Sequence, residues 1–325
     1  MIQYNFLIDK NTYFAYWVQT LIKWTWLFEK KNSVFYNSLN GEYTEQEKES
    51  LDQLKEILQK KENAFLWLWK RYAGEAIEQK EEEQLWESIQ NVFSKKFERV
   101  WKEELPLIER WQGILADYPQ QKMNELYIQV AHFLNYRQIT KDNIIDVKLC
   151  PNTNPLPGGH AKKEFPHVLL LDISRVDPCY FQNAIMVLAH ETIHLFEYEA
   201  QTPKELLKQS FHTIIVPRNI RVKGGGPHWH HLFMEAMITS IASKRMQGYG
   251  AHFLFGSNEH PIKENVDVVL NRENYNFQIR IVAEAMMEMT QEYLEQGKII
   301  DSDYCDAIAT EWVRVAEQYW FAEKM

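Results

Sequence analysis

AIMVLAHETIHL, residues 184–195, is an apolar stretch interrupted by a His-Glu pair and by a second histidine. Residues four apart on an α-helix lie on one face, one turn apart, so His190 and His194 can direct their rings to one point. Burial of such a polar group is costly unless its members pair with one another or bind an ion. The stretch therefore predicts a buried helix with a metal-ligating histidine pair. The alternative is a helix whose histidines are satisfied by hydrogen bonds in the core.

The intervening glutamate has a different expected role. Glu191 projects about 100° round the helix from His190, so it would flank an ion rather than bind it. Zinc accepts two imidazole nitrogens at this spacing and lowers the pKa of a bound water to about 7. We therefore expect Zn²⁺ on His190 and His194, with Glu191 as the general base that takes a proton from that water.

A catalytic zinc ion usually has three protein ligands and one water, so a third ligand must come from elsewhere in the chain. The best source is a second helix, expected to begin at Pro227 and to continue to about Met246. Glu235 is the first candidate on it. The alternatives are His228, His230 and His231 on the same helix, and Glu284 in a second Glu-Ala-Met run.

Two resemblances to known families bear on this third ligand. The stretch FMEAMIT, residues 233–239, resembles the second motif of gluzincin peptidases, where a glutamate followed by a small residue binds the metal; this implies Glu235 as the ligand. The stretch GGPHW, residues 225–229, is similar to the second motif of SprT-like proteases, His-Gly-Pro-x-Trp. Because Gly225 stands at the ligand position of that motif, this resemblance implies that His228 binds instead.

Both families are zincin metallopeptidases, whose core order is a strand, an active-site helix and a ligand helix. Zincins commonly stabilise the developing oxyanion with a Tyr or His on a downstream segment. The resemblance thus implies Tyr249 in this role, with His252 and His260 as alternatives. It also implies that the strand expected at residues 167–173 is an edge strand to which a substrate peptide can add.

The rest of the chain has two textures. Residues 1–140 have helical periodicity, with a first helix capped by Asn11 or Thr12 and a capping box from Thr44 to Glu47. Beyond them, β-branched and apolar runs predict two strands. The fold class expected is α+β and predominantly helical: a helical N-terminal domain, residues 1–140, and a zincin-like catalytic domain with a small sheet, residues 141–325. The other expected elements are strands at 144–149 and 167–173 and helices at 64–72, 81–101, 104–118, 122–136, 177–200, 277–295 and 304–322. A loop that can carry a short helix near Leu206 is expected at about 201–226.

Composition restricts the location and the partners. A net charge of −9 without a basic block disfavours nucleic acid as a partner, although it leaves room for a local basic groove. Cys150, Cys179 and Cys305 have no CxxC spacing and are expected to be reduced, as in a cytoplasmic protein. Neither a signal peptide nor a membrane span is predicted.

The sequence therefore favours a zinc-dependent metallopeptidase that acts on a peptide or protein substrate. One alternative is a SprT-like protease that acts near DNA. Another is a catalytically silent zincin fold that serves as a binding module.

Overall fold

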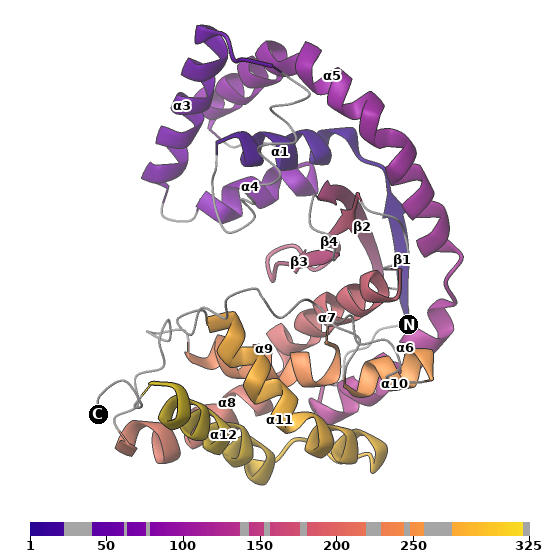
Figure 1. Ribbon diagram of the computed structural model, residues 1–325, viewed down its shortest axis with the longest axis vertical. Coiled ribbons are helices and arrows are strands. Elements are labelled where there is room, and N and C mark those ends of the chain that lie inside the picture. Colours follow the sequence, from indigo (N-terminus) through magenta and orange to yellow (C-terminus); the bar gives the residue numbers. More distant parts are fainter. Residues whose placement is uncertain are drawn as a thin grey trace. The chain divides into compact units, whose positions relative to one another are not determined.

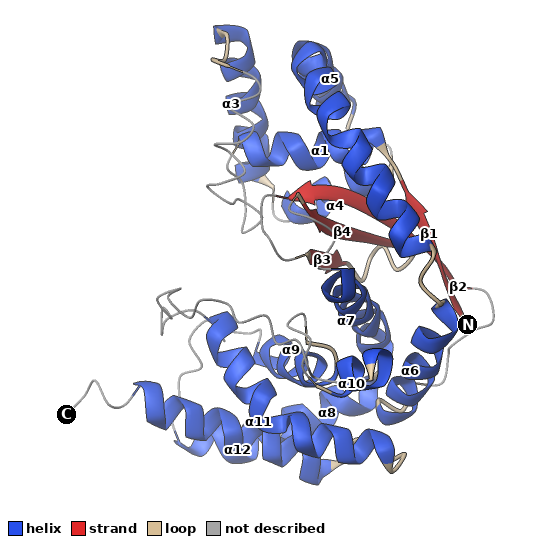
Figure 2. Ribbon diagram, turned by 45° about the vertical axis from the view of Figure 1, so that its right-hand side comes forward, coloured by secondary structure: helices blue, strands red, loops and turns tan. Residues whose placement is uncertain are grey.

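A computed structural model describes residues 1–22, 41–61, 64–75, 79–136, 143–152, 157–175, 181–218, 229–243, 248–256 and 275–320. Helices dominate this part of the chain, and its strands form a single four-stranded sheet (Figures 1 and 2). The expected class, α+β and predominantly helical, is confirmed at this level. No helix among the described residues is long and apolar enough to span a lipid bilayer.

The elements follow one another along the chain in an order that separates the strands into two groups. The strands are β1 (Ile2–Leu7), β2 (Asn143–Asn152), β3 (Gly158–Ala161) and β4 (Val168–Ser174). The helices are α1 (Lys10–Leu21), α3 (Glu45–Lys60), α4 (Ala64–Ala73), α5 (Lys80–Ala116), α6 (Gln120–Phe133), α7 (Phe181–Glu199), α8 (Gln201–Ser210), α9 (Trp229–Ile241), α10 (Tyr249–Phe255), α11 (Tyr275–Glu295) and α12 (Ser302–Trp320).

The chain divides into two compact units. The first, here called the C-terminal unit, consists of Met1–Gln3, Pro119–Asn143 and Ile185–Met325. The second, here called the sheet unit, consists of Tyr4–Tyr118 and Ile144–Ala184. These units differ from the expected division into residues 1–140 and 141–325. Each unit takes segments from both sides of residue 140, because β1 joins the sheet and the end of the expected N-terminal domain packs with the C-terminal helices.

The sheet of the sheet unit has the strand order β1-β2-β4-β3. β2 and β4 are parallel, with Cys150 opposite Asp172, and β3 runs antiparallel to β4, with Gly158 opposite Asp172. β4 therefore has a neighbour on both sides. The expectation that residues 167–173 form an edge strand is wrong, because the short β3, which the sequence analysis does not predict, covers that side.

Aromatic packing between α1 and α5 forms the core of the sheet unit. The rings of Phe14 and Phe97 meet edge to face at 4.9 Å, and those of Trp17 and Phe93 do so at 5.8 Å. The N-cap of α1 is Asp9, two residues before Asn11 and three before Thr12, the expected caps. The Asp9 side chain accepts hydrogen bonds from the backbone N–H groups of residues 11 and 12. The helical N-terminal region is thus anchored to its own aromatic core, and it also contains β1, which was not expected there.

Lys148 of β2 is a buried cation within this unit. Its Nζ donates to Oδ2 of Asp9 at 2.7 Å and to the backbone carbonyl of Tyr72 at 2.8 Å. The lysine thereby links a strand, the cap of α1 and the last turn of α4. Such a buried charge is tolerated because both partners satisfy it.

In the C-terminal unit, α9, α11 and α12 lie side by side (Figures 1 and 2). Hydroxyl groups join them: Ser240 lies 2.8 Å from Thr290, whose Oγ1 lies 2.7 Å from the hydroxyl of Tyr304. The N-terminal residues belong here too, since the Asn124 side chain makes two hydrogen bonds with the backbone of Ile2. The contacts of Ser240, Thr290 and Tyr304 therefore fix α9 against α11 and α12 independently of any ligand.

Local predictions from the sequence have mixed outcomes. The Thr44–Glu47 capping box is confirmed, with both of its hydrogen bonds present. The expected break between helices 81–101 and 104–118 is wrong, because α5 continues through Pro106. Residues 201–218, expected mainly as a loop, are helical throughout. Cys150 and Cys305 are free and buried, whereas Cys179 and the expected helix start at Asp177-Pro178 lie outside the described residues.

Candidate metal centre

The helix predicted around the HETIH motif is present as α7. Its residues 184–189 are fully buried apolar side chains, which fix the helix in the interior. His190, Glu191 and His194 are buried as well, with 2%, 6% and 6% of their surface exposed. The neighbouring Thr192 is satisfied within the helix, since its hydroxyl donates to the carbonyl of Leu188 at 2.8 Å. The apolar residues 184–189 therefore place the HETIH motif in the core.

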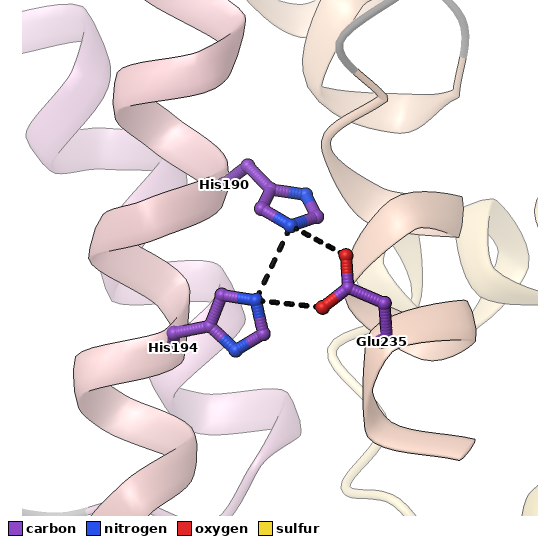
Figure 3. Close-up of side chains that lie close together, drawn as sticks. All are labelled: His190, His194 and Glu235. Carbon is purple, nitrogen blue, oxygen red and sulfur yellow. Dashed lines mark hydrogen bonds and ion pairs between the residues drawn. The ribbon is translucent and has the colours of Figure 1, made fainter. Parts of the chain in front are cut away.

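Glu235 of α9 meets both histidines (Figure 3). Nε2 of His190 lies 3.1 Å from one carboxylate oxygen of Glu235, and Nε2 of His194 lies 3.0 Å from the other. The two Nε2 atoms are 3.2 Å apart. Glu235 keeps 22% of its side chain exposed. Two helices distant in sequence thus bring three potential ligand atoms together.

The second nitrogen of His190 fixes which atom faces this group. Nδ1 lies 3.0 Å from the carbonyl oxygen of Ala242, just after α9, and a carbonyl can only accept. The proton of a neutral His190 ring is therefore on Nδ1, and its Nε2 presents a lone pair to Glu235. Two electron-rich atoms at 3.1 Å need a shared positive charge between them, either a proton or a metal ion.

The spacing of the three donor atoms fits a small tetrahedral ion. Ligand atoms about 2.0–2.1 Å from one tetrahedral centre lie about 3.3 Å from each other. The two Nε2 atoms are 3.2 Å apart, and each lies 3.0–3.1 Å from a different oxygen of Glu235. With one oxygen taken as the ligand, the three donor atoms lie within 4.8 Å of one another. Among the described residues, His190, His194 and Glu235 form the one group of three or more metal-ligating side chains with converging donor atoms. Two imidazoles and one carboxylate are also a donor set that zinc accepts.

The electrostatics of the group favour a bound cation. Burial opposes ionisation of Glu235, but the two histidines hold the pKa of its carboxyl well below the usual range. Burial likewise opposes a charge on His194, but Glu235, Glu197 and Glu191 outweigh it and raise the pKa of His194 to about 10. Carboxylates therefore dominate the potential at the His194 ring, and positive charge is stabilised there.

Of the other predicted ligands and oxyanion residues, those that the structure describes are not part of this group. The hydroxyl of Tyr249 donates to Oε1 of Gln129 on α6 at 2.5 Å, so it is engaged away from the three ligand atoms. His252 is exposed on α10. Glu284 of α11 forms an ion pair with Arg280 of the same helix, with its Oε1 3.6 Å from Nε of the arginine. His228 and His260 lie outside the described residues, as do the side chains of His230 and His231.

Two groups that contact the histidine rings, the Glu197 side chain and the Ala242 carbonyl, are not predicted from the sequence. Glu197, one turn after His194 on α7, has Oε2 3.6 Å from Nδ1 of that ring, and the i, i+3 spacing could have pointed to it. The carbonyl of Ala242 has no such signal, because any residue offers a backbone carbonyl. Its position depends on where α9 ends.

Comparison with models of protein families, with curated proteins and with solved structures gives no match. The interpretation of the site therefore depends on its own geometry.

Proposed function

We propose that this protein is a zinc-dependent metallopeptidase in which His190, His194 and Glu235 hold the metal. The observation that carries the proposal is the convergence of two Nε2 atoms and one carboxylate within 3.0–3.2 Å of one another. The sequence arrangement HETIH, with Glu191 between the histidines, adds a base next to that group. The substrate class proposed is a peptide or protein.

Zinc bound by His190, His194 and Glu235 would act as a Lewis acid, which makes a bound water a stronger acid and polarises the carbonyl of the substrate peptide bond. The protein's own contribution is orientation and proton transfer. The Ala242 carbonyl fixes the His190 ring, and Glu235 holds a negative charge between the two rings. The carboxylate of Glu191, in the same helical turn, is the proposed acceptor of a proton from the attacking water and its donor to the departing amine.

Glu235 supports the gluzincin-like alternative, because its carboxylate contacts both rings. His228, the ligand of the SprT-like alternative, lies outside the described residues. A cytoplasmic location remains part of the proposal and is supported by the free thiols of Cys150 and Cys305.

The test combines metal analysis with hydrolysis of denatured casein by the full-length protein purified without chelators. We expect one zinc ion per chain. Glu191→Gln should retain zinc and lose on the order of 10²–10⁴-fold in hydrolysis rate, the range for general-base catalysis. Glu199→Gln, at an exposed position of the same helix, is the matched control and should keep both properties.

The outcomes separate the rival functions. A protein without stoichiometric zinc would contradict the proposal. Zinc binding without any hydrolysis that depends on Glu191 would favour the catalytically silent zincin fold that serves as a binding module.

A further inference from the structure

We propose that Glu197 and Lys204 are positioning residues that orient the His194 ring for the metal, an inference that rests on the proposed zinc site. Neither residue belongs to the three ligands or is the proposed base. Both act from the far side of His194, through the ring nitrogen that does not face Glu235.

The His194 ring lies between two carboxylates. Its Nε2 faces Glu235 at 3.0 Å, and its Nδ1 faces Glu197 at 3.6 Å. The side chains of His194 and Glu197 are each only 7% exposed, so water screens this attraction weakly. Tyr198 stacks on the same ring, with centroids 6.0 Å apart and planes inclined by 23°. The ring is thus restrained on its face and on both of its nitrogen edges.

A carboxylate beside Nδ1 favours the tautomer that a metal ligand requires. Glu197 accepts only, so it favours a proton on Nδ1 and leaves the lone pair on Nε2. It also makes the ring a more basic ligand, as carboxylates do behind metal-bound histidines. His190 has the neutral Ala242 carbonyl in the same place. The Nδ1 atom of His190 therefore faces a neutral carbonyl, whereas the Nδ1 atom of His194 faces a charged carboxylate.

Lys204 holds Glu197 in place from the next helix. Its Nζ donates to the carbonyl of Tyr198 at 2.9 Å, in the last turn of α7, where a cation is favoured by the helix dipole. The same Nζ lies 3.8 Å from Oε1 of Glu197. α8 starts at Gln201, directly after α7, and this short connection places Lys204 there. The two Glu197 oxygens thus face Lys204 and His194 separately.

Zinc affinity measured by competition with a chelator tests this arrangement in the full-length protein. Glu197→Ala should weaken zinc binding about 10- to 100-fold, the usual effect of removing a partner behind a metal ligand. Glu197→Gln should cost less, because its amide oxygen keeps a partial negative charge beside Nδ1. The matched control is Glu199→Gln, whose carboxylate accepts from Tyr136 instead and should leave affinity unchanged.

A double-mutant cycle tests the role assigned to Lys204. Lys204→Met should weaken zinc binding severalfold in the wild-type background and have no further effect beside Glu197→Gln, because it acts through that carboxylate. A merely structural role predicts the reverse pattern: lower unfolding temperatures of the metal-free variants and additive effects on affinity.

The possible failures are distinguishable. Wild-type affinity in Glu197→Ala, or equal effects of Lys204→Met in both backgrounds, overturns the positioning roles and leaves the proposed function standing. Absence of zinc from the wild-type protein contradicts the proposed function itself.

Discussion

Glu235 uses both oxygens, one for each histidine ring, and this division makes its replacement informative. Glu235→Gln keeps the shape of the side chain but removes its charge and turns one oxygen into a donor. We expect zinc affinity to fall by more than the roughly 10–100-fold typical of residues behind a ligand. Glu284→Gln is the matched control, since it lies in the same Glu-Ala-Met context, and it should bind zinc normally.

Thermal unfolding gives a second measurement of the same change. A ligand at about 1,000 times its dissociation constant stabilises the folded state by about 4 kcal/mol. Added zinc should therefore raise the unfolding temperature of the wild type and of Glu284→Gln, and not that of Glu235→Gln. Equal shifts in all three proteins would assign the third ligand to another residue, with His228 the next to test.

The buried cation of Lys148 should contribute to the free energy of unfolding. Lys148→Met leaves Asp9 and the Tyr72 carbonyl without their buried cation, and we expect a loss of about 3 kcal/mol in the free energy of unfolding. This is the lower end for breaking a buried pair, because Asp9 is 28% exposed. Urea unfolding measures the loss.

The double variant separates the pair from its surroundings. Lys148→Met combined with Asp9→Asn removes both charges and keeps a side chain that can cap α1. It should be more stable than the sum of the two single losses implies. Strictly additive losses would show that the two side chains do not interact.

At the scale of elements, the first turn of α3 depends on pH. Burial alone would raise the pKa of Glu47, but hydrogen bonds from Lys96 and from the Thr44 backbone lower it below its ordinary value of 4.5. The carboxylate is therefore the form that stabilises the fold. Its contribution is complete above about pH 4.5 and is lost as pH falls through the lowered pKa.

Glu47→Gln should consequently reduce the free energy of unfolding by about 1–2 kcal/mol at pH 7, as loss of a cap and a buried pair predicts. The difference from wild type should shrink as the pH is lowered below 4.5. Glu45→Gln, in the same turn, removes an exposed pair with Lys48 and should cost less than about 0.5 kcal/mol. A difference for Glu47→Gln that persists unchanged at low pH would exclude its charge as the cause.

Helices and their caps were predictable from the sequence where interactions between residues close in sequence determine them. The Thr44–Glu47 box and the buried helix around HETIH were readable because capping and apolar runs act over a few residues. The break expected in α5 was wrong because Pro106 is exposed and tertiary packing continues the helix past it. β1 was missed because its neighbour β2 is distant in sequence, and β3 because its sequence, GGHA, has no β-branched residue and forms a strand only beside β4.

The same distinction applies to the site. HETIH and the FMEAMIT stretch indicated His190, His194 and Glu235 before the structure brought them together. The i, i+3 spacing from His194 could have pointed to Glu197, but the roles of Lys204 and the Ala242 carbonyl required the structure. They depend on rotamers and on where α7 ends and α9 stops, which no motif encodes.

At the scale of the whole molecule, the interleaved units predict the behaviour of fragments. A cut between residues 140 and 141 would separate β1 from β2 and α6 from the C-terminal helices. We expect neither fragment 1–140 nor fragment 141–325 to unfold cooperatively when expressed alone, as followed by circular dichroism during urea titration.

Co-expression of the two fragments provides the control for that experiment. Co-expressed fragments should restore a cooperative transition, because every native contact becomes available again. Cooperative unfolding of either fragment by itself would contradict the interleaved organisation and support two domains consecutive in sequence.

The bond between Ile2 and Asn124 has a consequence for the order of events in the cell. Asn124 supplies both a donor and an acceptor to the backbone of Ile2, with distances of 2.9 and 2.7 Å. A ribosome makes residue 2 first and residue 124 much later, and β2 later still. During translation, at about 5–20 residues per second, β1 therefore spends several seconds as an unpaired strand. The emerging chain presents the unpaired backbone N–H and C=O groups of β1 to chaperones and to other nascent chains until its partners have been synthesised.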